Sequence, residues 1–312
     1  MGQQRIGRRM LLVSLQVMLL SLLLVANTMA TTIIDAGGQS VTIGKPFTRI
    51  ISLYGAHTEN LFSLGLDAEI IGVTTSDDFP ARANAKKRFS YREDAEKFIA
   101  ARPDLVLVRP MIARAYPHLL AKLQQAGITV VSLQPTNIED TFLYWRQLGS
   151  LTGREPQAAE MVESFQQGVA EIGKKVETIP AAQRRRVYFE AIHRKMKTFA
   201  PTSMTIFALT TAGGINVAAD ASQVRNTNIA AYGKERIMSH AHEIDVFLAQ
   251  KGVMNKIDRQ RIMDEPGFSA IKAVRQGQIH LIDEKLVSRP TMRLLTGIRG
   301  IGKILYPELF GG

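Results

Sequence analysis

Residues 49–80, RIISLYGAHTENLFSLGLDAEIIGVTTSDDFP, decide the fold of this chain. A β-branched run at 50–53 is followed by a short polar turn, by a helix that ends at Gly65, and by a second apolar run at 70–73. Continuous apolar runs, unlike alternating ones, indicate strands that are buried on both faces, as in a parallel sheet covered by helices. Since open α/β sheets bind ligands at the carboxyl ends of their strands, we expect the functional residues in the turns that follow these runs.

The same cycle of strand, turn, helix and strand recurs further along the chain. The stretches FIAARPDLVLVRP (98–110) and LLAKLQQAGITVVSLQP (119–135) place strands at 105–108 and 129–133. The second half continues with strands at 186–190, 244–248 and 278–282, a helix near 204–212 and a C-terminal helix over 292–305. The pattern therefore predicts two α/β units.

A single long helix is predicted over 155–178. Its apolar residues recur at three- and four-residue spacing, Pro156 suits the first turn, and Pro180 lies just beyond the end. About 23 residues at 1.5 Å each give roughly 35 Å, enough to cross from one lobe to another. An ordinary amphipathic surface helix would show the same pattern, so the spacing alone leaves both interpretations open.

Several short motifs, taken in order, carry a resemblance that spans nearly the whole chain. They are Arg49-Ile-Ile-Ser-Leu, Thr58-Glu-Asn-Leu61, Leu64-Gly-Leu through Ile71-Gly-Val, Arg102-Pro-Asp-Leu-Val, Leu123 to Val131, Leu148-Gly-Ser-Leu-Thr-Gly153, Ala212-Gly-Gly-Ile-Asn216, Glu265-Pro-Gly-Phe268, Ala273 to His280 and Leu305-Tyr-Pro307. In these the chain resembles the substrate-binding proteins of ABC importers, of the family that captures ferric siderophores, haem and cobalamin.

The resemblance implies two lobes, each a mainly parallel sheet flanked by helices, joined by one long backbone helix. We expect a signal peptide at 1–30, an N-terminal α/β lobe at 31–153, the connecting helix at 154–180 and a C-terminal α/β lobe at 181–312. The implied partners are a membrane permease with its ATPase and a small-molecule metal chelate bound between the lobes. We expect a monomer without a cofactor, and no nucleic-acid partner.

The first thirty residues are typical of an export signal. Arg5, Arg8 and Arg9 precede an apolar run at 10–26, and Ala30 ends a stretch of small residues suited to cleavage. A retained membrane anchor is the alternative, but the run is short and interrupted by polar residues. The chain has no cysteine, which excludes disulfides and removes the usual site of lipid attachment. We therefore expect a free periplasmic protein that is not a lipoprotein.

The composition excludes several other classes of function. The net charge is +11, which could indicate a nucleic-acid-binding protein. However, the basic residues are scattered, and 184–186 is the one dense cluster, which argues against that function. The stretch Gly297 to Lys303 has the glycine and lysine spacing of a phosphate-binding loop, yet Ile304 stands where magnesium binding needs Ser or Thr. No nucleophile elbow and no H-E-x-x-H motif occur. The sequence therefore predicts a binding protein, not an enzyme, although an enzyme acting on a metal chelate remains an alternative that fold class cannot exclude.

The candidate ligand-binding residues lie in turns at the expected cleft. They are Tyr54, His57, Asp78, Phe79, Tyr91, Arg92, Arg109, Met111, His193, Lys195, Lys197, Arg289 and Arg293, and Asp77, Ser90 and Glu284 lie beside them. Guanidinium groups match carboxylate and catecholate oxygens, and the aromatic rings offer flat apolar faces. The set favours an anionic, partly aromatic ligand, which places a ferric siderophore or haem ahead of cobalamin. Solvated loop charges are the alternative for each residue alone.

Two further kinds of site are considered. His57 and His193 each follow the first strand of a lobe and could together bind a metal, so a bare divalent metal, or an oxyanion such as molybdate, is an alternative ligand. In the family that the chain resembles, each lobe presents a glutamate to arginines of the permease. Glu96 matches the first of these positions well, and Glu235 matches the second less well.

Overall fold

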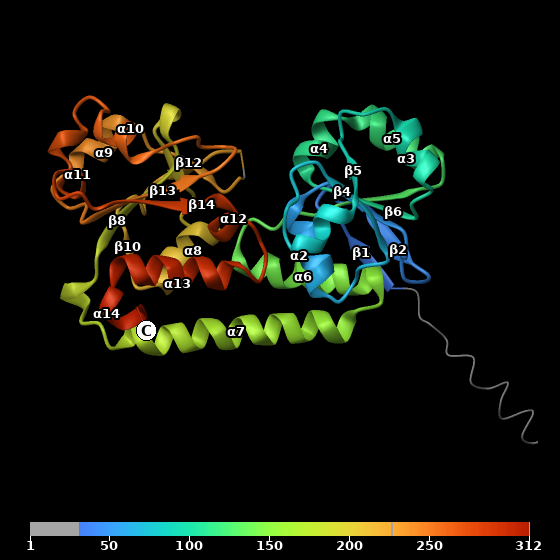
Figure 1. Cartoon of the computed structure of the whole chain (residues 1–312), viewed down its shortest axis with the longest axis horizontal. Helices are drawn as coiled ribbons and strands as arrows, with labels where there is room; N and C mark the ends of the chain where they lie inside the picture. Colours follow the sequence, from blue (N-terminus) through green and yellow to red (C-terminus); the bar gives the residue numbers. More distant parts are fainter. Residues whose placement is uncertain (1–30, 226, 312) are drawn as a thin grey trace, which may run out of the picture.

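The computed structural model describes residues 31–225 and 227–311, so the predicted signal peptide lies outside the described residues. Two α/β lobes lie side by side, and one long helix, α7 (Glu155–Glu177), runs beneath both of them (Figure 1). This is the helix that the apolar spacing predicts over 155–178. Within the described residues, no helix is both long and apolar enough to cross a membrane.

The first lobe is built on a five-stranded parallel sheet with strand order β5-β4-β3-β6-β7. A separate antiparallel hairpin, β1–β2, lies beside it. The strands are β1 Thr31–Ile34, β2 Ser40–Ile43, β3 Ile50–Ser52, β4 Ile70–Thr74, β5 Lys87–Phe89, β6 Leu105–Val108 and β7 Thr129–Ser132; the helices are α2 Gly55–Ser63, α3 Ala95–Ala101, α4 Pro110–Ala115, α5 Pro117–Gln125 and α6 Ile138–Thr152.

Both faces of this sheet are buried, as the continuous apolar runs predict. Leu105 and Leu107 of β6 pack on the side of α2 and α6, while Val106 and Val108 pack on the side of α3, α4 and α5. Adjacent side chains of a strand point to opposite faces, so a strand between two helical layers needs apolar residues at every position.

The second lobe is built on a seven-stranded mixed sheet. The strands β10, β8, β13 and β14 are parallel, and β9, β12 and β11 add antiparallel pairs at one side. The strands are β8 Arg186–Ile192, β9 Lys197–Phe199, β10 Ile215–Asn216, β11 Ser222–Gln223, β12 Ile229–Ala231, β13 Val246–Lys251 and β14 Ile279–Asp283; the helices are α8 Met204–Thr211, α9 Lys234–Ser239, α10 Arg259–Met263, α11 Lys272–Arg275, α12 Glu284–Val287, α13 Leu294–Leu305 and α14 Pro307–Phe310.

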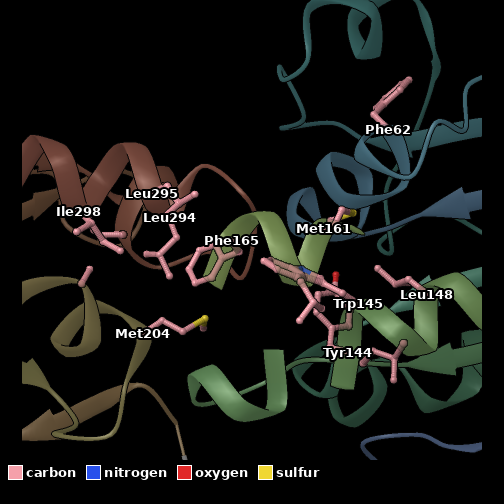
Figure 2. Close-up of a cluster of buried hydrophobic side chains, with 14 of the residues drawn as sticks. Phe62, Tyr144, Trp145, Leu148, Met161, Phe165, Met204, Leu294, Leu295 and Ile298 are labelled. Atoms are coloured by element: carbon pink, nitrogen blue, oxygen red, sulfur yellow. The ribbon is translucent and has the colours of Figure 1, made fainter. Parts of the chain in front are cut away.

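One hydrophobic core joins the two lobes (Figure 2). Trp145 of α6 packs edge-on against Phe165 of α7, with ring centroids 5.4 Å apart, and both belong to a cluster that includes Met204 of α8 and Leu294 of α13. The cluster runs from strands of the first sheet to strands of the second. The lobes are therefore connected by shared packing as well as by the chain.

Candidate ligand-binding site

The carboxyl ends of the two parallel strand sets are turned toward each other. In Figure 1, β14 leads into α12, which lies next to the first lobe, and β8 and β13 run parallel to β14. On the other side, β3 leads directly into α2, which lies next to the second lobe. The predicted ligand residues occupy these two facing edges.

Hydrogen bonds and ion pairs between the lobes are concentrated on the segment 284–293, which spans α12 and the turn after it. The carbonyl oxygen of Pro290 accepts hydrogen bonds from Asn60 Nδ2 (2.8 Å) and Trp145 Nε1 (3.1 Å) of the first lobe. Lys285 forms an ion pair with Asp78, which holds the pKa of the Asp78 carboxyl below its usual value. These contacts fix the segment against the first lobe.

Arg289 and Arg293, predicted to bind ligand, are instead paired with Glu59. Arg289 Nη1 lies 2.8 Å and Arg293 Nη1 lies 3.4 Å from Glu59 Oε1, and the Glu59 side chain is only 3% exposed. The Arg293 guanidinium also lies over the Phe79 ring, 4.2 Å from its centroid. The two arginines therefore hold the lobes together and position Phe79, which is 43% exposed.

Asp77 lies beside this ion pair. Its Oδ2 accepts a hydrogen bond from Thr58 Oγ1 (2.5 Å), and burial raises the pKa of Asp77 to about 6. A Cβ at Gly55 would lie 2.4 Å from Arg289 Nη1 and 2.9 Å from Asp77 Oδ1, so only glycine leaves room for both groups there.

His57, predicted to bind ligand or metal, is buried, and both of its ring nitrogens are engaged within the protein. The side chain is fully buried; Nδ1 lies 2.6 Å from Tyr144 Oη, and Nε2 lies 2.9 Å from the Val108 carbonyl oxygen. Burial lowers the pKa of His57 to about 4, so the ring is neutral at physiological pH. It joins α2 to α6 and β6.

His193 does lie at the carboxyl end of β8, but its ring is held by two carboxylates. Nδ1 lies 2.8 Å from Glu190 Oε2, and Nε2 lies 3.5 Å from Glu265 Oε2. The hydrogen bond to Glu190 raises the pKa of His193, which is 5% exposed. Within the described residues, no group of three or more His, Asp or Glu is arranged to hold a metal ion.

The remaining predicted residues of the first lobe form a surface of rings and guanidinium groups. The Arg109 guanidinium lies over the Tyr54 ring at 4.9 Å, and burial is the main cause of the raised pKa of Tyr54. Tyr91 packs against Tyr116 with ring centroids 4.9 Å apart, and the exposed Arg92 lies next to it in the chain. Met111, like Tyr91 and Tyr116, packs against the core on the α3–α5 side.

In the second lobe, Lys195 is exposed directly after β8, and Lys197 begins β9 and is half-buried. Sequence reasoning missed a further turn at this edge, 252–255 after β13, with the exposed residues Val253 and Met254. It was missed because the strand was expected at 244–248, whereas β13 extends to Lys251. The apolar run of β13 ends at Ala249, and the polar residues Gln250 and Lys251 still belong to the strand, so the run alone does not locate the turn.

Two concave pockets lie away from these edges. One, beside the start of α7, is lined by residues that include Leu64, Gly65, Arg154 and Met161. The other lies between the end of α7 and the C-terminal residues 305–309. Neither is lined by a predicted ligand-binding residue.

Comparison with known proteins identifies relatives that match most of the chain. The family model described as "Periplasmic binding protein" matches residues 50–286. The chain is 28% identical, over 89% of its length and 86% of the relative's, to an uncharacterized ABC transporter substrate-binding lipoprotein of Bacillus subtilis. It is 22% identical to the vitamin B12-binding protein of Vibrio cholerae, over 83% of this chain and 90% of that one.

A solved structure agrees with the fold. The chain is similar, with a TM-score of 0.73 and 27% identity, to a structure described as a "possible" iron-binding (periplasmic solute-binding) protein of Staphylococcus epidermidis, covering 84% of this chain and 100% of that one. The predicted two-lobed α/β fold is thereby confirmed.

The relative from Bacillus subtilis corrects the prediction about localisation. From the missing cysteine we expected a free periplasmic protein that is not a lipoprotein, but this relative is a substrate-binding lipoprotein. The localisation prediction is therefore contradicted.

Proposed function

Since the chain belongs to the periplasmic binding protein family of ABC transporters, we propose that it captures an anionic metal chelate, a ferric siderophore or haem in preference to cobalamin, between the facing edges of its two sheets. Proteins of this family are substrate-binding transport proteins, not enzymes. They bind small-molecule ligands and work with a permease and an ATPase. The proposal concerns which ligand this chain takes and which residues hold it.

The observation that carries the proposal is the difference between two sets of cations at the facing edges. Arg289, Arg293 and Lys285 are paired with carboxylates. In the described part of the chain, the other predicted cations, Arg92, Arg109, Lys195 and Lys197, form no ion pair. Cations without a carboxylate partner favour an anionic ligand, to which they can offer charge-assisted hydrogen bonds.

The aromatic residues supply the apolar part of the proposed site. Tyr54, beneath Arg109, and Phe79, beneath Arg293, each combine a ring face with a guanidinium group. A catecholate or tetrapyrrole has flat apolar faces and anionic groups at its rim, which this combination matches. Arg289, Arg293 and Asp78 contribute indirectly, since they fix the spacing of the two lobes.

The test is elemental analysis with an absorption spectrum of protein purified from its native host, followed by titration with candidate ligands. Iron with a charge-transfer or Soret band is the expected result. Stoichiometric zinc, manganese or molybdenum would overturn the chelate proposal and support a bare metal or an oxyanion. Cobalt would identify a corrinoid, and would overturn the preference for an iron chelate.

We further propose that Glu96 and Glu235 contact the permease. Both are exposed in the first turn of a helix, α3 and α9 respectively, and Figure 1 shows both helices on the side of the lobes away from α7. Glu96→Arg should abolish ligand uptake by cells without changing ligand affinity, because opposite charges steer docking. The matched control is Glu163→Arg on α7. Normal uptake by the Glu96 variant would contradict this role.

A further inference from the structure

A turn in the second lobe displays apolar side chains at the edge that faces the first lobe. Val253 is 79% and Met254 is 51% exposed, and both directly follow β13, which lies between β8 and β14 inside the sheet. Single exposed apolar residues are common and need no explanation. Here, however, the surroundings of the turn show that its conformation is fixed.

A buried network of hydrogen bonds connects the turn 252–255 to the end of β8. Asn255 Nδ2 donates to Glu190 Oε1 (3.2 Å) and to the Gln250 carbonyl oxygen (3.0 Å), and Asn255 Oδ1 accepts from the His193 amide (3.0 Å). Gln250 Nε2 donates to the carbonyl oxygen of Ala191 (2.9 Å) and approaches the Met254 sulfur at 3.8 Å. Asn255, Gln250 and Glu190 are all at most 4% exposed. Buried polar groups that are mutually satisfied rigidify what they hold, so the apolar tip is preformed.

The charged groups around the turn differ in whether they are already engaged by the protein. Lys251 and Lys256 flank it, both are exposed, and neither forms an ion pair within the described residues. Three acidic residues lie near the turn: Asp283 opposite Lys251 in the β13–β14 pair, Asp258 two residues after Lys256, and Glu284, whose Oε2 accepts a hydrogen bond from the Met254 amide (3.2 Å) and whose side chain lies against Gly252. The Glu284 carboxylate is thus engaged by the backbone of the turn, while the two ammonium groups are not.

Building on the proposed function, we propose that the turn 252–255 is the part of the site that selects an amphipathic anion. Val253 and Met254 contact the apolar body of the chelate, and Lys251 and Lys256 bind its anionic groups. Methionine suits this role because its side chain adapts to irregular apolar surfaces. The Lys285–Asp78 ion pair, one residue from Glu284 and one from Phe79, joins this turn to the aromatic surface of the first lobe.

The experiment measures the affinity of the full chain for haemin, a ferric tris-catecholate, ferrichrome and cyanocobalamin. Quenching of Trp145, the single tryptophan, provides the signal. The test variants are Val253→Ser/Met254→Gln and Lys251→Gln/Lys256→Gln. The matched control is Leu143→Gln, since Leu143 is 55% exposed on α6 in the first lobe.

We expect the parent to bind haemin or the tris-catecholate. The apolar double variant should bind it at least about ten-fold more weakly, from the apolar area that the ligand no longer covers. The lysine double variant should show weaker binding and a smaller dependence on salt. Equal affinity in the parent and the apolar double variant, or the same loss in the control, would overturn the role of the turn while leaving the proposed function intact.

Two other outcomes test the selection of an anion and the proposed function itself. Binding of ferrichrome or cyanocobalamin alone, both of which are neutral, would overturn the selection of an anion. Binding of none of the four would contradict the proposed function itself.

Discussion

Replacing Glu59 with glutamine should strongly weaken the connection between the lobes. Glu59 is 3% exposed and lies 2.8 Å from Arg289, whose side chain is 15% exposed. Removing one partner of a buried ion pair costs about 3–5 kcal/mol, because the other charge is left unpaired. Asp77 lies close enough to Arg289 to compensate in part. We therefore expect the free energy of unfolding to fall by about 2–3 kcal/mol.

The assay is urea unfolding followed by Trp145 fluorescence, since Trp145 Nε1 donates to Pro290 on the segment that Arg289 holds. Glu171→Gln is the matched control, because its pair with Arg299 (3.9 Å) is solvent-exposed and should contribute nothing measurable. The double variant Glu59→Gln/Arg289→Gln should lose less than the sum of the two single variants. A loss below about 0.5 kcal/mol for Glu59→Gln would refute the view that a buried charge pair joins the lobes.

The remaining predictions concern pH and packing. The folded-state pKa of His57, about 4, lies below its ordinary value, so its contribution to stability is lost as pH falls; His57→Gln should lessen the decline between pH 6.5 and 4 by about 3 kcal/mol in urea unfolding. Asp77 has the opposite effect on the pH dependence of stability, because its folded-state pKa, about 6, is raised and its protonation favours the folded state. Asp77→Asn should therefore lose more stability than the parent as pH falls from 6 to 4, and the same dependence of unfolding free energy on pH in both proteins would contradict this. Gly297→Ala should destabilise the protein by about 1–3 kcal/mol, because the new Cβ would lie 2.3 Å from the Leu286 carbonyl oxygen. In Gly300→Ala, on the same helix and with open space around it, thermal unfolding should show a gain of up to about 1 kcal/mol.

Strands that a local sequence pattern determines were predicted closely, whereas strands that depend on hydrogen-bonding to a neighbouring strand were not. β6 matches its prediction at both ends, because its apolar run is bounded by Pro103 and Pro110. The antiparallel strands β9, β11 and β12 have only two or three residues each and no period to detect. They exist because a neighbouring strand supplies hydrogen-bond partners, which is information from distant sequence.

The same reason limits what the sequence predicts about the surroundings of the site residues. His57 does follow the first strand, as predicted, but whether its ring faces solvent or core depends on Val108 and Tyr144, which are 51 and 87 residues away. Arg289 finds its carboxylate 230 residues away. Local sequence identifies which residues end a strand, but the partners of their side chains come from the tertiary structure.

The division of cations into paired and unpaired sets gives the site its physical logic. Arg289 and Arg293 share the single carboxylate of Glu59 inside the protein, so they fix the distance between the lobes whether or not a ligand is present. Arg109 and Lys195, on opposite lobes, are then held at a spacing set in advance, and a ligand gains their attraction without paying to bring them together. Unpaired cations also raise the local concentration of anions and speed their capture. A ligand that bound Arg289 would first have to break its buried ion pair with Glu59. Contacts with the unpaired cations, such as Arg109 and Lys195, carry no such cost.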